Sequence, residues 1–360
     1  MSCEPRQTPS RGGNRGLSNR WPKLLKHGLA LQELSLSRIV EAVLFAAREN
    51  QNSHVAELQF ASKLEKNPEI MKARLGRIKY ACRMLDIKPG AVLLDVGSGI
   101  GLNSVLSLFC GVQEVHSVEM TYDRLRSAQL IIDFLGLEDR VRLHGQDVLN
   151  LDLRPGTVDA AFSFELLEHI RDIGSLYGKL ALWLKEGGRV FGRTGANGRN
   201  LIYHWVFRKQ WDMIDNEHYV GIREEAITSV VPQLPEADLR LLVNRTRGEL
   251  IDEVMRVAEE YSRNGTIPPP KPACAPRDPC TAQYMERLLD PYETAAIMDA
   301  QGFRTSVLKP NFRDITTVNP ILAMALKTVG GMIRLGHPAS LLFAPWLEFL
   351  SHREPRPHRA

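Results

Sequence analysis

The chain has 360 residues, of which 44% are hydrophobic and 24% charged, as is usual for a soluble globular protein. It contains neither the apolar core of a secretory signal nor a run of about 18 apolar residues, which argues against a secreted or membrane-spanning protein. We therefore expect a cytoplasmic location. The net charge of +4 is concentrated in residues 1–27, where six Arg or Lys residues outweigh Glu4. We predict a disordered basic tail there, with an arm for nucleic acid or an anionic membrane as the alternative.

The next part of the chain changes from helical to alternating periodicity. Residues 28–87 place apolar side chains such as Leu34, Ile39 and Val43 at helical spacing, which predicts an N-terminal helical segment. From Lys88 strands and helices alternate, as in a parallel α/β sheet. Strands are expected at 91–95, 115–119, 141–145, 158–163 and 188–193, with helices such as 121–136 and 173–184 between them.

After Thr194 this rhythm breaks. Residues 195–235 look loop-rich, 236–263 look like one long charged helix, and 267–276 form a Pro-rich connection. Because such an insertion is too long for a simple loop, we predict a cap or lid over residues 195–290, next to the core at 88–194. Residues 291–350 are expected to complete the sheet with a helix at 292–300, a strand at 302–308, a helix at 319–334 and a strand at 340–349, before a tail at 351–360.

A glycine-rich loop follows the first expected strand. Asp95-Val96-Gly97-Ser98-Gly99-Ile100-Gly101 follows the apolar residues 91–94 and precedes a helical pattern. Glycines at the carboxyl end of such a strand let a ligand approach the backbone closely. Leu102 stands where a dinucleotide-binding fingerprint requires glycine, which argues against a nicotinamide-dependent oxidoreductase. The acidic residue that ends the strand suits a cationic cofactor better than a pyrophosphate.

Two further acidic residues follow the next strands. Glu119 ends the second strand about 20 residues beyond the glycines, where a carboxylate can accept hydrogen bonds from both ribose hydroxyls. The alternative is an ordinary surface carboxylate. Asp147 follows the third strand and would, taken alone, be interpreted as a turn residue.

These features together resemble class I S-adenosylmethionine (SAM)-dependent methyltransferases over residues 84–194 and again over 292–350. The resemblance includes Leu167-Glu168-His169 after the fourth strand and the turn at 184–190. It implies a Rossmann-like, seven-stranded, mostly parallel sheet with helices on both faces, N-terminal helices and a largely helical cap. At Asp147 it implies contact with the adenine amino group. The cofactor contacts that it implies are Asp95, Gly97, Ser98, Gly99, Gly101, Glu119, Met120, Asp147, Val148 and Phe164.

The run Glu165-x-x-Glu168-His169 offers carboxylate and imidazole groups, which suit Mg²⁺, Mn²⁺ or Zn²⁺. A similar run binds a divalent metal in ubiquinone-pathway O-methyltransferases and in small-RNA terminal 2′-O-methyltransferases. His218 would supply the further histidine that the RNA enzymes add. The predicted metal ligands are thus Glu165, Glu168, His169 and His218. The alternative is a metal-independent enzyme in which the histidine packs near the cofactor or acts as a base.

Methyl transfer needs a positioned nucleophile, and a hydroxyl acceptor also benefits from a base. The candidate bases are His169, His204 and His218, each with a structural role as the alternative. Aromatic residues of the insertion are expected either to line an acceptor pocket or to pack the cap on the sheet: Tyr203, Trp205, Phe207, Trp211 and Tyr219.

We therefore predict methyl transfer from SAM to a small-molecule acceptor, at oxygen in preference to other atoms. Natural products, sugars and lipid precursors are candidate acceptors. The alternatives are a metal-assisted RNA 2′-O-methyltransferase and a non-catalytic SAM-binding regulator. The tail lacks interleaved aromatic residues, which argues against nucleic acid. We expect no transmembrane segment, keep peripheral membrane contact open, and expect a monomer or a homodimer.

Overall fold

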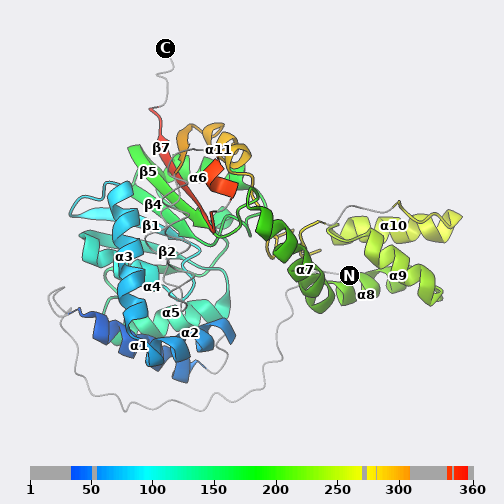
Figure 1. Ribbon diagram of the computed structural model, residues 1–360, viewed down its shortest axis with the longest axis horizontal. Coiled ribbons are helices and arrows are strands. Elements are labelled where there is room, and N and C mark those ends of the chain that lie inside the picture. Colours follow the sequence, from blue (N-terminus) through cyan, green and yellow to red (C-terminus); the bar gives the residue numbers. More distant parts are fainter. Residues whose placement is uncertain are drawn as a thin grey trace.

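A computed structural model describes residues 34–50, 55–269, 274–280, 282–308, 339–342 and 344–355. Within this part of the chain, seven strands form one sheet in the order β3-β2-β1-β4-β5-β7-β6 (Figure 1). They are β1 (Ala91–Val96), β2 (Val112–Val118), β3 (Val141–His144), β4 (Val158–Phe164), β5 (Leu184–Thr194), β6 (Phe303–Val307) and β7 (Leu347–Arg353). The first five strands run parallel, and β7 runs antiparallel to β5 and β6. The predicted Rossmann-like, mostly parallel sheet is confirmed.

Helices cover both faces of this sheet, as expected. On one face lie α1 (Leu36–Glu49), α2 (Val55–Lys66), α3 (Glu69–Met84), α4 (Leu102–Ser107) and α5 (Tyr122–Leu135). Their apolar side chains share a core with inward-facing strand residues such as Leu93 and Phe162. On the other face, α6 (Ile173–Trp183) and α11 (Pro291–Asp299) form a second core with Leu94 and Val190. Because side chains alternate along a strand, Leu93 and Leu94 contribute to opposite cores.

The expectation of a loop-rich segment over 195–235 is wrong. The structure has α7 (Leu201–His218) and α8 (Val220–Val230) there. The Asn200 side chain accepts hydrogen bonds from the backbone N–H groups of Ile202 and Tyr203, which starts α7. No Gly or Pro interrupts residues 199–220, so nothing in the sequence breaks the helix.

The single helix expected over 236–263 is also wrong, because two helices replace it. They are α9 (Glu236–Arg245) and α10 (Ile251–Asn264). Gly248 between them has a φ of 75°, a left-handed conformation that ends helical geometry and favours glycine. The helices α7–α10 lead away from the sheet (Figure 1), and α8, α9 and α10 share an apolar core of their own. We call α7–α10 the arm.

A buried ion pair joins helices of the arm. The Arg223 guanidinium on α8 contacts both carboxylate oxygens of Asp215 on α7, at 2.9 and 2.7 Å, and its Nε donates to the Val243 carbonyl on α9. Arg223 is fully buried. The pair therefore holds the three helices together only while both partners are present, because removal of either one leaves a buried charge without compensation.

The last strand lies further along the chain than the predicted 340–349. A short 3-10 turn spans Ala339–Leu342, and β7 begins at Leu347 and runs into the predicted tail. Pro345 cannot donate a hydrogen bond to the ladder, which is consistent with a strand that starts after it. The predicted tail at 1–27 and helix at 319–334 lie outside the described residues. No helix in the described ranges is long and apolar enough to cross a bilayer.

Candidate active site

The glycine-rich loop turns sharply between β1 and α4. Gly97, Gly99 and Gly101 all have positive φ values, of 72°, 58° and 72°. A Cβ atom on Gly97 would lie 2.7 Å from Cδ1 of Leu166, so both the backbone conformation and the nearby side chain favour glycine. The N–H groups of Gly97 and Ser98 donate to the Val118 carbonyl at the end of β2. The loop is thus fixed against the neighbouring strand.

Two carboxylates stabilise this loop. Glu119 accepts hydrogen bonds from the Gly99 N–H at 2.9 Å and from the Thr121 N–H at 2.7 Å, one on each carboxylate oxygen. Asp95 is buried at the end of β1 and accepts from the Ser104 hydroxyl at 2.6 Å. Burial raises the pKa of Asp95 to about 7, against the opposing effect of that hydrogen bond and of Arg74. Both carboxylates therefore help to hold the loop in its conformation.

A cavity of about 400 Å³ opens at the carboxyl ends of β1, β2, β3 and β4. This is the edge at which open α/β sheets bind ligands. Predicted site residues that line it are Gly97, Glu119, Met120, Asp147, Val148, Glu165 and His169. Other predicted contacts, namely Asp95, Ser98, Gly99 and Gly101, hold the loop without lining the cavity, and Phe164 lines a smaller cavity beside it.

Asp147 lies where β3 ends. Its side chain accepts a hydrogen bond from the Leu149 N–H at 2.9 Å, which caps the short 3-10 turn Val148–Asn150. Asp147 also lines the cavity, as does the neighbouring Val148. Asp147 therefore both caps the turn and lines the cavity.

The run after β4 places its three polar side chains in different surroundings. Glu165 has a φ of 51°, costly for a residue with a Cβ, and its Oε2 accepts from the Gly195 N–H at 2.6 Å. Glu168 is buried and does not line the cavity, and burial together with the nearby charge of Glu165 raises its pKa to about 8. His169 lines the cavity, and burial lowers its pKa below the usual value. One run of sequence therefore supplies one acid that lines the cavity, one buried acid and one neutral imidazole.

The orientation of the His169 ring follows from its contact. Nδ1 lies 3.3 Å from the Tyr284 carbonyl oxygen, which can only accept a hydrogen bond. Nδ1 therefore carries the proton when this bond forms, and Nε2 of the neutral ring is an acceptor.

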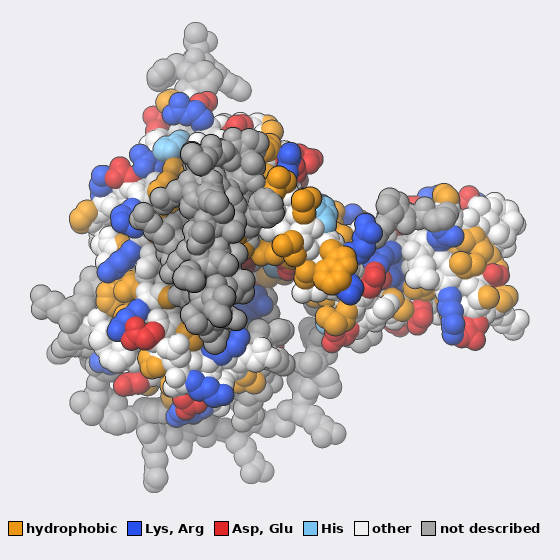
Figure 2. All heavy atoms as spheres, in the orientation of Figure 1, with side chains coloured by type: hydrophobic (Ala, Val, Ile, Leu, Met, Phe, Trp, Pro, Cys, Tyr) orange, Lys and Arg blue, Asp and Glu red, His pale blue; other side chains and the backbone are white. Residues whose placement is uncertain are grey.

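The other two candidate bases lie elsewhere. His204 is exposed on α7, with Nε2 2.6 Å from the Gly198 carbonyl, and His218 is exposed at the end of α7. Neither lines the cavity. Of the five aromatic residues expected either to line an acceptor pocket or to pack the cap on the sheet, only Tyr219 lines the cavity, whereas Trp205 is 65% exposed. With Leu201, Ile202 and Met213, Trp205 belongs to the hydrophobic side chains exposed on α7, a region visible in Figure 2.

The predicted metal ligands do not form a cluster. Glu168 is buried and His218 is exposed at the end of α7, and neither lines the cavity that Glu165 and His169 line. No group of three or more His, Cys, Asp or Glu side chains that could hold a metal occurs among the described residues. The residues present thus do not fit the metal site on which the RNA methyltransferase alternative depended.

Sequence patterns missed a segment that closes one side of the cavity. Asp278, Gln283, Tyr284 and Met285 line it, although they lie more than 100 residues after His169 in the chain. Arg287 anchors this segment by donating to the Ile170 carbonyl at 2.7 Å and by stacking its guanidinium 4.5 Å from the centre of the Tyr284 ring. These contacts are long-range, and no local spacing in the sequence signals them.

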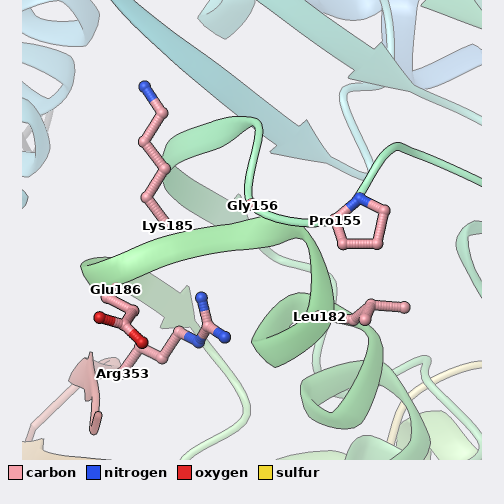
Figure 3. A pocket seen from close by; sticks show the side chains of 6 residues that line it. All are labelled: Pro155, Gly156, Leu182, Lys185, Glu186 and Arg353. Carbon is pink, nitrogen blue, oxygen red and sulfur yellow. The ribbon is translucent and has the colours of Figure 1, made fainter. Parts of the chain in front are cut away.

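Another hollow, of about 380 Å³, lies at the opposite ends of β4 and β5 (Figure 3). Pro155, Gly156, Leu182, Lys185, Glu186 and Arg353 line it, and the Lys185 side chain points away from Glu186 and Arg353. Because none of the predicted site residues lies there, the cavity beside the glycine-rich loop is the candidate active site.

Comparison with protein families and with curated proteins identifies relatives of this chain. The family model described as mycolic acid cyclopropane synthetase matches residues 60–241. Phosphoethanolamine N-methyltransferase 3 of Arabidopsis thaliana is 30% identical over 107 residues, which cover 30% of this chain and 21% of that protein. Sterol 24-C-methyltransferase of Pneumocystis carinii is 23% identical over 193 residues, which cover 52% and 47%. The chain thus spans less than half the length of these curated relatives.

Among solved structures, geranyl diphosphate C-methyltransferase from Streptomyces coelicolor is similar to this chain. The sequence identity is 13% and the TM-score 0.43, with 78% of each chain covered.

Proposed function

Because the chain belongs to the mycolic acid cyclopropane synthetase family of SAM-dependent methyltransferases, we propose that it transfers the methyl group of SAM to a small-molecule acceptor. The observation that carries this proposal is the joint position of Gly97, Glu119 and Asp147 around one cavity at the carboxyl ends of β1, β2 and β3. A sulfonium cofactor supplies a methyl group that is already activated, so the protein has mainly to bind, orient and exclude water.

The cavity residues fit such a cofactor. Each oxygen of Glu119 accepts one backbone N–H, and a carboxylate oxygen has room for a second donor. Glu119 therefore has the capacity to accept both hydroxyls of a ribose. Asp147 and Val148 would receive the adenine ring at the end of β3, and Gly97, which lines the same cavity, would lie beside the amino acid part of the cofactor.

For the acceptor atom we propose oxygen, with His169 as the base. His169 faces the cavity, and its lowered pKa keeps the imidazole neutral at pH 7. With Nδ1–H directed at the Tyr284 carbonyl, Nε2 is the atom that would take the proton of an attacking hydroxyl. A neutral base beside a bound sulfonium also avoids placing two positive charges together.

The cavity walls suit a small acceptor. Leu166, Ile170, Tyr219 and Met285 supply apolar surface, and the segment that ends in Met285 closes one side. Contact of the acceptor with these walls would reduce the access of the water that otherwise competes with it.

Calorimetry tests the proposal. We expect SAM and its demethylated product, S-adenosylhomocysteine, to bind and NADH not to bind. Glu119→Ala should weaken SAM binding by about ten- to a hundredfold, because charge-assisted hydrogen bonds to the ribose are lost. Glu138→Ala removes an exposed carboxylate from the same half of the domain and is the matched control. Unchanged SAM affinity in Glu119→Ala would contradict the role given to Glu119, and binding of NADH in place of SAM would contradict the function.

A labelled donor tests the acceptor atom. A SAM carrying a trideuterated methyl group, incubated with fractionated small-molecule extracts, should yield a product whose label is attached to oxygen. A label on carbon or nitrogen would refute the choice of oxygen while leaving methyl transfer intact.

A further inference from the structure

Two cysteines from different elements line one cavity away from the candidate active site. Cys82 lies near the end of α3, and Cys110 ends the short 3-10 turn η2 (Leu108–Cys110) that follows α4. A cavity of about 560 Å³ has both residues in its walls and shares no lining residue with the cofactor cavity. Because α3 packs against α4 and η2 (Figure 1), the fold brings the two thiols together.

The two thiols contact each other but differ in their surroundings. The hydrogen bond between them raises the pKa of Cys82 and lowers the pKa of Cys110. Burial also raises the pKa of Cys82, which is only 4% exposed. The positive charge of Lys79 lowers the pKa of Cys110 further, although burial acts in the opposite direction there. Cys110 is therefore the thiol that ionises more readily, with Cys82 as its hydrogen-bond donor.

The cavity walls favour a negative charge on Cys110. Lys79 precedes Cys82 by three residues on α3, so the two lie on the same face of the helix, and both line the cavity. Asp86 is the one carboxylate among the lining residues, and it accepts from the Lys88 ammonium at 2.6 Å. The walls thus carry a cation close to Cys110, whereas their carboxylate has a cationic partner of its own.

We propose that Cys82 and Cys110 form a reversible disulfide bond when the protein meets a hydroperoxide, with Cys110 as the attacking thiol. The thiolate is the reactive form of cysteine, and oxidant-sensing cysteines combine it with partial exposure and an adjacent second thiol. Cys110 is partly exposed and lies against Cys82. A disulfide needs the two sulfurs about 2 Å apart, which is a short approach for thiols that are already in contact.

The reaction has two steps. The Cys110 thiolate attacks one oxygen of the peroxide, the O–O bond breaks, and the other oxygen leaves as hydroxide and takes a proton to become water. Cys110 is then a sulfenic acid, and the negative charge that kept Cys82 protonated is gone. Cys82 next attacks the sulfenic sulfur, the S–O bond breaks, and the hydroxyl group leaves as water with the proton of Cys82. The two sulfurs together lose two electrons, which the peroxide gains.

Peptide mapping of the full chain tests the disulfide. Hydrogen peroxide is added to reduced protein, the remaining thiols are blocked with N-ethylmaleimide under unfolding conditions, and the unreduced digest is analysed by mass spectrometry. We expect a linked peptide pair that contains Cys82 and Cys110, and dithiothreitol should return both thiols. Cys280→Ser removes an exposed cysteine outside this cavity and, as the matched control, should give the same linked pair.

Dimedone, which labels sulfenic acids, tests the order of the two steps. In Cys82→Ser the second thiol is missing, so dimedone should label Cys110 after peroxide treatment. In Cys110→Ser the residue Cys82 should stay unlabelled, because it is buried and protonated. Labelling of Cys82 in place of Cys110 would contradict the assignment of the attacking thiol. Thermal unfolding verifies that both variants fold, and the mapping of the wild type needs neither.

Lys79 gives a second measurement. Iodoacetamide alkylates the thiolate, so the pH midpoint of Cys110 alkylation follows the pKa of that thiol. Lys79→Met should move the midpoint to higher pH and slow alkylation at pH 7 by about three- to tenfold. Lys79→Arg should restore the rate. Lys72→Met removes an exposed lysine from the same helix outside this cavity, and it should leave the rate unchanged.

The proposal is overturned if peroxide leaves Cys82 and Cys110 unlinked, if the linked peptides contain other cysteines of the chain instead, or if Cys110 is oxidised beyond the sulfenic acid without a link. Packing of two small apolar side chains, with no redox role, predicts unlinked thiols and equal alkylation rates in Lys79→Met and Lys72→Met. None of these measurements depends on the methyl-transfer activity, so the two proposals stand or fall separately.

Discussion

Glu168→Gln should make the protein more stable at alkaline pH. Glu168 is 1% exposed, and its buried Oε2 has no hydrogen-bond partner among the described residues. Burial and the charge of Glu165 raise its pKa from the usual 4.5 to about 8, so the folded protein favours the protonated form. Glutamine has the shape of that neutral form and does not ionise.

The direction of the pH dependence follows from this shift. Because the folded state holds the proton more tightly than the unfolded state, the stabilisation is complete below pH 4.5 and is lost as the pH rises through 8. The shift corresponds to at most about 5 kcal/mol. Local relaxation and water penetration reduce the cost of a buried charge, so we expect a difference of about 2 kcal/mol.

Urea unfolding at pH 5 and pH 9 measures this difference. Wild type and Glu168→Gln should unfold at similar urea concentrations at pH 5, and the variant should resist higher concentrations at pH 9. Glu186→Gln removes an exposed carboxylate at the start of β5 and should follow the wild type at both pH values. Equal pH dependence in wild type and Glu168→Gln would refute the reasoning.

Two other predictions concern His169 and the arm. The imidazole resonance of His169, assigned in NMR spectra by its absence from His169→Asn, should titrate with a midpoint below 6.5, because burial disfavours the cation; a midpoint above 6.5 would argue against a neutral base. Asp215→Ala should cost about 3 to 5 kcal/mol in unfolding free energy, measured with urea, because it leaves Arg223 fully buried without its ion-pair partner. A loss below about 1 kcal/mol would show that water or another group compensates Arg223.

The parts of the fold that follow local rules were predictable from the sequence. The apolar run before Asp95 and the glycines after it specify a strand and a sharp turn, and Glu119 at the end of the next strand lies where the topology requires. Each of these features depends on residues that are close in the chain. The cofactor side of the candidate site could therefore be predicted from the sequence.

Other parts depend on contacts that the sequence pattern does not reveal. Tyr284 reaches His169 across more than 100 residues, and Arg77 and Arg193 line one cavity although they are also more than 100 residues apart in the chain. The helix α7 was not predicted, because its aromatic and histidine residues suggested a loop. The absence of Gly and Pro between 199 and 220 was the more reliable signal of a helix. Because Glu165, Glu168 and His169 are close in the sequence, their side chains were expected to meet at one site. Glu168 is instead buried and does not line the cavity.

The position of β7 between β5 and β6 has a consequence for synthesis on the ribosome. Since β7 follows β6 in the chain but lies inside it in the sheet, β6 has no strand to pair with until β7 has emerged. During that interval β5 presents an unpaired edge, and such an edge invites association with other chains. We expect the nascent chain to depend on chaperones most strongly while residues 195–346 are being made. Slower translation through this stretch would lengthen the exposure of that edge.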